Sequence, residues 1–128
     1  MYKAEEDYLE AILMLEQKNG TVRSVDVAKA KEVTKPSVSH AMSVLRDKGF
    51  VTFAENNAIQ LTKEGRVIAE AVYDRHTLLT EFLAGITGLE REQAEQNACR
   101  IEHDVDCDVV AGIKMWMRKN MARADESK

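Results

Sequence analysis

Three side chains of the kinds that bind metal ions lie close together in the stretch NACRIEHDVD, residues 97–106. Cys99, Glu102 and His103 are spaced at i, i+3 and i+4, so a helix would place all three on one face. A thiolate, a carboxylate and an imidazole are uncommon within one helical turn unless a ligand uses them. Each also has an ordinary explanation, because a lone cysteine is usually a small core residue and a lone histidine is usually packed or solvated. The stretch alone therefore leaves a metal site and an exposed polar face both open.

Further metal-ligand side chains lie on two other predicted helices. Asp7 and Glu10 are spaced at i, i+3 near the start of the chain, and His76 lies on a long helix in the middle. The two acidic residues have an alternative role, since carboxylates in the first turns of a helix complement its dipole. Three helices that converge on one centre would supply five or six ligands. That number suits octahedral Fe(II) or Mn(II) better than tetrahedral Zn(II).

The composition is that of a folded protein without a membrane span. Of the 128 residues, 45% are hydrophobic and 31% are charged, which is ordinary for a globular chain. The longest apolar run, residues 11–15, is too short to cross a bilayer, and the start MYKAEEDYLE has no apolar signal-peptide core. Two cysteines, Cys99 and Cys107, are too few for a disulfide scaffold. We expect a cytoplasmic protein with no membrane partner.

Charge is distributed unevenly along the chain. The whole sequence carries a net charge of −4, but residues 21–52 contain six basic and three acidic side chains, a local charge of +3. Residues 81–108 contain eight acidic and two basic side chains, a local charge of −6. A basic first half and an acidic second half indicate two different tasks in one chain.

The hydrophobic periodicity predicts helices first, then a hairpin, then helices again. Apolar residues recur at three- and four-residue intervals in the helical segments and alternate in two short strands. Gly85 and Gly88 are expected to end the long helix. Ser24 and Thr34 are expected to cap the second and third helices. The last helical stretch is expected to be interrupted near residues 104–106. The predicted segments are helices 2–17, 24–31, 34–48, 62–82 and 89–119, and strands 50–54 and 58–61.

This order of elements is that of a winged helix-turn-helix, in which the third helix enters the DNA major groove. The predicted fold is therefore mainly α, with a winged helix-turn-helix DNA-binding domain at residues 1–62 and an α-helical dimerisation and metal-binding domain at residues 63–128. A plain helix bundle with solvated lysines and serines is the alternative. The expected DNA-binding residues are Lys35, Pro36, Ser37, Ser39 and His40 at the start of the third helix, with Arg46 and Lys48 at its end touching the backbone.

An apolar face near the C-terminus is a candidate dimer surface, although it suits an intrachain core equally well. Its residues are Val109, Val110, Ile113, Met115, Trp116 and Met117.

Five segments spread over the chain carry a resemblance to a known family: EDYLEAILML, VAKAKEVTKPSVSHAMSVLRDKGFV, LTKEG, RHTLLTEFL and ACRIEHDV. They resemble the diphtheria toxin repressor family of iron- and manganese-dependent transcriptional repressors. The resemblance implies a homodimer that binds a divalent metal as co-repressor, recognises palindromic double-stranded operators and silences metal-uptake genes. The resemblance also implies a short form of the family, without an SH3-like domain.

By motif position, six residues fall where the family places its metal ligands: Asp7, Glu10, His76, Cys99, Glu102 and His103. The set is a hybrid. Asp7 and Glu10 are similar to the manganese-responsive branch, whereas Cys99 is similar to the iron-responsive branch. A thiolate favours Fe(II) and carboxylates favour Mn(II), so we expect Fe2+ in preference to Mn2+, with one or two ions per subunit.

Three positions depart from the family pattern. Thr80 and Glu95 stand where the iron-responsive branch has the Glu and His of a second metal site, which puts that site in doubt. Lys31 stands where the family usually buries a leucine, so the second helix is expected to pack differently or to end early.

Two other function classes are compatible with the residues. A metal-independent winged-helix regulator would sense oxidation through Cys99 or bind a small organic effector. A small metalloenzyme could use the Cys, Glu and His around iron, but the sequence offers neither a dedicated base nor a substrate pocket. We therefore expect a regulator and no enzymatic activity.

Overall fold

A computed structural model of the chain describes residues 3–126, with the side chains of residues up to 121. The chain divides into two compact units, Met1–Val72 and Tyr73–Lys128. The division falls inside the long helix α4 (Lys63–Thr87). The fold is mainly helical, as the sequence predicts.

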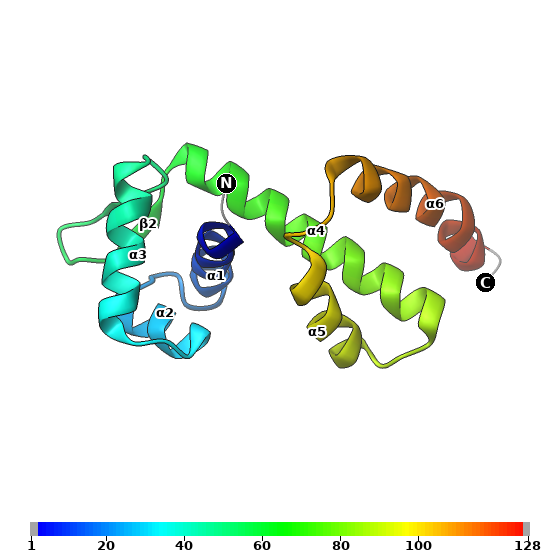
Figure 1. The fold of residues 1–128 in the computed structure, drawn as a ribbon, viewed down its shortest axis with the longest axis horizontal. Coiled ribbons are helices and arrows are strands. Elements are labelled where there is room, and N and C mark those ends of the chain that lie inside the picture. The colour runs from blue at the N-terminus through cyan, green and yellow to red at the C-terminus, as the bar shows by residue number, and fades with distance from the viewer. Residues whose placement is uncertain (1–2, 127–128) are drawn as a thin grey trace. The chain divides into compact units, whose positions relative to one another are not determined.

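The first unit has the order of elements that defines a winged helix-turn-helix (Figure 1). Helix α2 contacts both α1 and α3, and the hairpin follows α3. The first turns of α4 complete the unit. The bounds are α1 Lys3–Asn19, α2 Ser24–Lys31, α3 Lys35–Asp47, β1 Val51–Phe53 and β2 Ile59–Leu61.

Apolar stripes of α1 and α3 form part of the core of this unit, and Val51 and Ile59 of the hairpin are buried as well. In α1, Leu9, Ile12 and Leu13 recur at i, i+3 and i+4 and are no more than 2% exposed. In α3, Val38, Met42 and Leu45 form the matching stripe and are equally buried. Burial of such stripes, rather than helix propensity, supplies most of the stability of helices this short.

The helix caps confirm one sequence prediction and correct another. Thr34 is the N-cap of α3, and its Oγ1 accepts a hydrogen bond from the N–H of Ser37 at 3.3 Å. The predicted Ser24 cap of α2 is wrong, because Arg23 is the N-cap and Ser24 is the first helical residue. The N–H of Arg23 donates to the Asp26 carboxylate at 3.0 Å, so an acid three residues into the helix satisfies the exposed amide.

The hairpin is held against the start of α4 by a close backbone contact. Its antiparallel strands pair Val51 with Leu61 and Phe53 with Ile59. Thr62 Oγ1 donates to the Gly49 carbonyl at 2.7 Å and accepts from the N–H of Gly65 at 3.0 Å. A Cβ atom at Gly65 would lie 2.0 Å from the carbonyl oxygen of Phe50, so only glycine fits this position.

In the second unit, two glycines behave differently from each other. The predicted end of the long helix near residue 82 is wrong, because α4 continues through Gly85 to Thr87. A glycine inside a helix costs only about 1 kcal/mol relative to alanine, and here the missing Cβ leaves room for the Met121 side chain. Gly88, with a φ of +73°, is the residue at which the chain leaves the helix.

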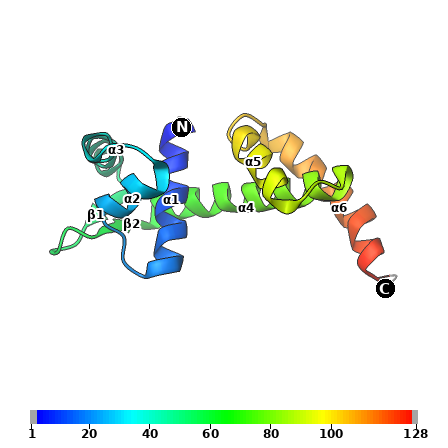
Figure 2. The same ribbon diagram turned by 90° about the horizontal axis from the view of Figure 1, so that it is seen from below.

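The remaining helices of the second unit are α5 (Arg91–Ile101) and α6 (Cys107–Glu126), which lie beside the second half of α4 (Figure 2). The predicted interruption near residues 104–106 is confirmed, since residues 102–106 form a turn between the two helices. Helix α6 extends beyond the predicted residue 119. Phe82 of α4 and Trp116 of α6 pack edge to face, with ring centroids 5.8 Å apart and planes at 86°.

Candidate metal centre and DNA-binding surface

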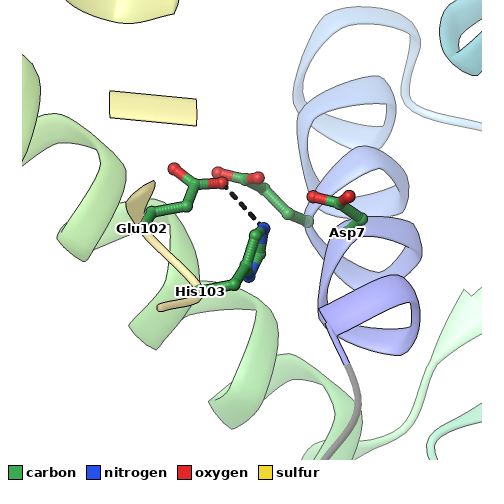
Figure 3. A group of neighbouring side chains, drawn as sticks. Asp7, Glu102 and His103 are labelled. Atoms are coloured by element: carbon green, nitrogen blue, oxygen red, sulfur yellow. Dashed lines mark ion pairs between the residues drawn. The ribbon is translucent and has the colours of Figure 1, made fainter. Parts of the chain in front are cut away.

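The second unit buries one carboxylate between two imidazole rings. Glu102 is the C-cap residue of α5 and is 0% exposed. Its Oε2 lies 2.6 Å from Nδ1 of His76 on α4, and its Oε1 lies 3.1 Å from Nε2 of His103. Figure 3 shows the Glu102 and His103 side chains turned toward each other and joined by the dashed line. Burial of a carboxylate is costly unless it is paired, and here each oxygen has an imidazole beside it.

The geometry of Glu102 and His103 fits a shared metal ion. Two ligands at adjacent positions of an octahedral ion, each bonded at about 2.1 Å, lie about 3 Å from each other. The 3.1 Å between His103 Nε2 and Glu102 Oε1 matches that separation. The donors are an imidazole nitrogen and a carboxylate oxygen, which together suit first-row divalent metals.

The backbone at this position is fixed by a residue outside the predicted ligand set. Arg75 Nη1 donates to the main-chain carbonyl of Glu102 at 2.8 Å. The carbonyls in the last turn of a helix lack partners within the helix, so a guanidinium is a suitable donor there. Arg75 therefore holds the turn that carries Glu102 and His103.

In the first unit, the two predicted ligands of α1 project from one face of that helix. Carboxylate oxygens of Asp7 and Glu10 lie within 4.8 Å of each other. Glu10 is 7% exposed, an unusual degree of burial for a glutamate. Asp7, labelled in Figure 3, also forms an ion pair with Lys31 of α2.

Cys99 lies at the surface. It precedes Glu102 by one turn of α5, as the spacing requires, but its side chain is exposed. Cys107 begins α6 and is also exposed, and neither cysteine forms a disulfide. Cys99 lies in the last turn of α5, Glu102 is the C-cap residue of that helix and His103 lies in the turn that follows. The expectation that one helix carries all three residues is therefore wrong, because α5 ends at Ile101.

The predicted DNA-binding residues of α3 and its C-cap are exposed, whereas Val38, Met42 and Leu45 between them are buried. Two basic residues at the far end of α3 also have intramolecular partners. Lys48 Nζ lies 2.5 Å from Glu5 Oε1 of α1, and the Arg46 guanidinium lies 5.8 Å from the centre of the Phe53 ring. The exposed set is Lys35, Pro36, Ser37, Ser39, His40, Arg46 and Lys48.

Comparison with known proteins accounts for both halves of the chain. Residues 1–59 match the model for the N-terminal DNA-binding domain of iron-dependent repressors, and residues 62–121 match the model for their metal-binding and dimerisation domain. The chain belongs to the iron-dependent repressor family.

Relatives within the family differ in how much of their length the chain spans. A helix-turn-helix transcriptional regulator of Methanocaldococcus jannaschii is 28% identical over 120 residues, which cover 93% of this chain and 96% of the relative. The diphtheria toxin repressor of Corynebacterium diphtheriae is 33% identical over 104 residues, which cover 81% of this chain but only 46% of that protein. The chain thus spans about half the length of some relatives it matches.

Among solved structures, a manganese-dependent transcriptional repressor in complex with manganese superposes with a TM-score of 0.82. It is 27% identical, and the match covers 88% of this chain and 52% of that one. The family consists of metal-dependent DNA-binding transcriptional repressors rather than enzymes. None of the helices within residues 3–126 is long and apolar enough to cross a membrane.

Sequence reasoning missed the role of Arg75. The residue lies next to His76, but nothing in the spacing links it to a carbonyl 27 positions further along. The departure of Lys31 from the family pattern predicts altered packing but not its contact with Asp7. Both contacts depend on the meeting of two helices, which periodicity alone does not specify.

Proposed function

We propose that this protein is a transcriptional repressor activated by a divalent metal ion, with Fe2+ favoured over Mn2+, and that it acts as a homodimer on palindromic operators of metal-uptake genes. The observation that carries the proposal is the fully buried Glu102 carboxylate between His76 and His103. It lies in the domain that matches the metal-binding domain of the family.

The proposed ligand set is the one expected from the sequence: Asp7, Glu10, His76, Cys99, Glu102 and His103. The separation of the ligand atoms in Glu102 and His103 supports the inclusion of these two residues. A second ion per subunit has less support, because Thr80 Oγ1 donates to the His76 carbonyl at 2.8 Å and Glu95 pairs with Arg91 at 3.7 Å. One ion per subunit is therefore the proposed stoichiometry.

The proposed switch is electrostatic. Without metal, the carboxylates of α1 and Glu102 repel one another, so α1 is not held to the helices that follow α4. A dication reverses this repulsion and joins α1 to the second domain through shared ligands. Because α1 contacts α2 and α3, the metal then restricts the placement of the recognition helix. When the DNA-binding domains of both subunits of a dimer are restricted in this way, a larger share of the dimer can bind the operator, so operator affinity rises. Metal and DNA favour the same state, so each tightens the binding of the other.

We propose that residues 1–62 bind DNA and that residues 63–128 bind metal and dimerise. The start of α3 supports the first role, since exposed serine, histidine and lysine side chains there are suited to base edges and phosphates.

An exposed apolar groove in the second unit supports dimerisation. Its walls come from α4 and α6, and its volume is about 360 Å³. Ile86, Val109 and Trp116 are 50%, 47% and 44% exposed, which is a large apolar surface to leave in water. The lining residues are Phe82, Ile86, Val109, Gly112, Ile113 and Trp116.

The deciding experiment titrates DNA binding with Fe(II), Mn(II), Co(II) and Zn(II) under anaerobic conditions, with metal stoichiometry measured in parallel. The DNA is a duplex selected from a random pool by the protein with Mn(II) present. We expect each active metal to strengthen binding and a chelator to abolish it, with Fe(II) effective at the lowest free concentration. DNA binding that a chelator leaves unchanged would instead identify a metal-independent regulator.

A matched pair of variants tests the thiolate preference for iron. Cys99→Glu replaces the soft ligand by a hard one, and we expect it to improve Mn(II) affinity relative to Co(II). Cys107→Glu makes the same change at the other exposed cysteine and should leave the ratio unchanged. An unchanged ratio in Cys99→Glu as well would remove Cys99 from the ligand set.

A further inference from the structure

Lys31 of α2 forms an ion pair with Asp7, a proposed metal ligand. Its Nζ lies 3.6 Å from Oδ2 of Asp7 and 5.3 Å from the centre of the Tyr8 ring. The Lys31 side chain is 24% exposed and that of Asp7 is 28% exposed, so the pair is partly shielded from water. Ion pairs in such positions are screened less than those at the open surface.

The location of Lys31 in the chain connects this contact to the start of α3, the proposed DNA-recognition helix. Lys31 is the last residue of α2. Glu32 follows in the left-handed conformation at φ 55°, and α3 begins at Lys35. The pair of Lys31 and Asp7 therefore joins α1 to the turn that leads into the recognition helix.

We propose that Lys31 is a built-in competitor of the metal ion for Asp7 and so sets the metal concentration at which the protein responds. The inference rests on the proposed role of Asp7 as a ligand. In the metal-free protein, the ammonium group partly neutralises the Asp7 carboxylate. A dication at the same carboxylate must displace this ammonium or bind beside it. Displacement costs free energy because the ion pair with Asp7 is lost, and binding beside the ammonium costs free energy because the two cations repel each other.

The size of the effect follows from the exposure of the pair. Exposed ion pairs are worth about 0.2–1 kcal/mol, and the repulsion between Lys31 and a nearby dication adds to that cost. Removal of the lysine charge should therefore tighten metal binding roughly two- to tenfold. The effect is Coulombic, so it should be similar for hard and softer divalent ions and should shrink as salt is added.

The test measures metal dissociation constants of the full chain by competition with a chromophoric chelator, using Mn(II) and Co(II) separately. Lys31→Met and Lys31→Gln remove the charge with a side chain of similar length. Lys29→Met is the matched control, because Lys29 is an exposed lysine of the same helix and its loss changes the net charge equally. Asp7→Asn tests the ligand role on which the inference depends.

We expect both Lys31 variants to bind Mn(II) and Co(II) more tightly by the same factor, and Lys29→Met to bind as the unaltered protein does. In metal-free protein, thermal unfolding of Lys31→Met, Asp7→Asn and the double variant should show that the two side chains are coupled. At high salt, the gain in metal affinity of the Lys31 variants over the unaltered protein should be smaller.

Two results would overturn the inference, and they are distinguishable. If Asp7→Asn weakens metal binding but the Lys31 variants bind as before or more weakly, Lys31 does not compete with the ion. If Asp7→Asn leaves metal binding unchanged, Asp7 is not a ligand, and both this inference and that part of the proposed ligand set are wrong.

Discussion

Nδ1 of His76 lies 2.6 Å from Oε2 of Glu102, although the two residues are 26 positions apart in the chain. The contact joins the middle of α4 to the end of α5 and leaves Oε1 of Glu102 beside His103. A carboxylate oriented in this way loses little freedom when an ion binds, because hydrogen bonds to a ligating carboxylate fix its direction.

The first prediction concerns the charge of that carboxylate. Glu102→Gln keeps the volume of the side chain but removes the anionic oxygen, so metal affinity should fall roughly 100-fold or more, beyond the effect typical of outer partners. Isothermal titration with Mn(II) measures the change. Glu95→Gln alters an exposed carboxylate of the same helix and should bind metal normally. Unaltered affinity in Glu102→Gln would rule out direct ligation by Glu102.

The second prediction concerns Arg75, which donates to the Glu102 carbonyl at 2.8 Å. Arg75→Ala should loosen the turn after α5 and weaken metal binding about tenfold, the effect expected of a residue that positions a ligand. Arg91→Ala removes a surface arginine of α5 and is the control. Equal affinities in the two variants would show that the hydrogen bond does not position the ligands.

The third prediction separates phosphate contacts from base contacts on α3. Lys35→Ala should weaken binding to all DNA sequences and reduce the slope of log affinity against log salt by about 1. Ser39→Ala should instead reduce discrimination at one base pair by roughly 1–3 kcal/mol. Fluorescence anisotropy on the selected duplex and on single-base variants distinguishes them. The opposite pattern would reverse the two assignments.

The fourth prediction concerns the apolar groove of the second unit. Ile86→Asp should convert the dimer to monomer in sedimentation experiments, because it places a charge in an apolar interface. Val67→Asp is a close control, since Val67 is also an exposed β-branched residue of α4 but lies outside the groove. A dimer that survives Ile86→Asp would place the interface elsewhere.

Periodicity in the sequence predicted the first unit well, because its helices and hairpin are defined by local patterns. The apolar stripe of α1, the Thr34 cap and the turn between the strands each depend on residues a few positions apart. Gly85 departs from the prediction for a tertiary reason. The Met121 side chain of α6 fills the space that a Cβ atom at Gly85 would take, and no local pattern reveals that contact.

The candidate site was predictable where chemistry and spacing coincide. Glu102 and His103 were visible as adjacent ligand types, and the structure places them 3.1 Å apart. The contact of His76 with Glu102 required the packing of α4 against α5. Lys31 shows the limit most clearly, because a lysine in place of a leucine predicts altered packing but not the carboxylate that it meets.

The contact between Gly65 and the Phe50 carbonyl has a mechanical consequence. The backbone of α4 at Gly65 and the carbonyl of Phe50 before β1 leave no room for one more carbon atom. The hairpin and the first turn of α4 are therefore packed together as one rigid segment. The hydrogen bonds of Thr62 Oγ1 to the Gly49 carbonyl and from the Gly65 N–H hold the two segments together at this point. We therefore expect the hairpin to move together with the start of α4 whenever that helix is displaced.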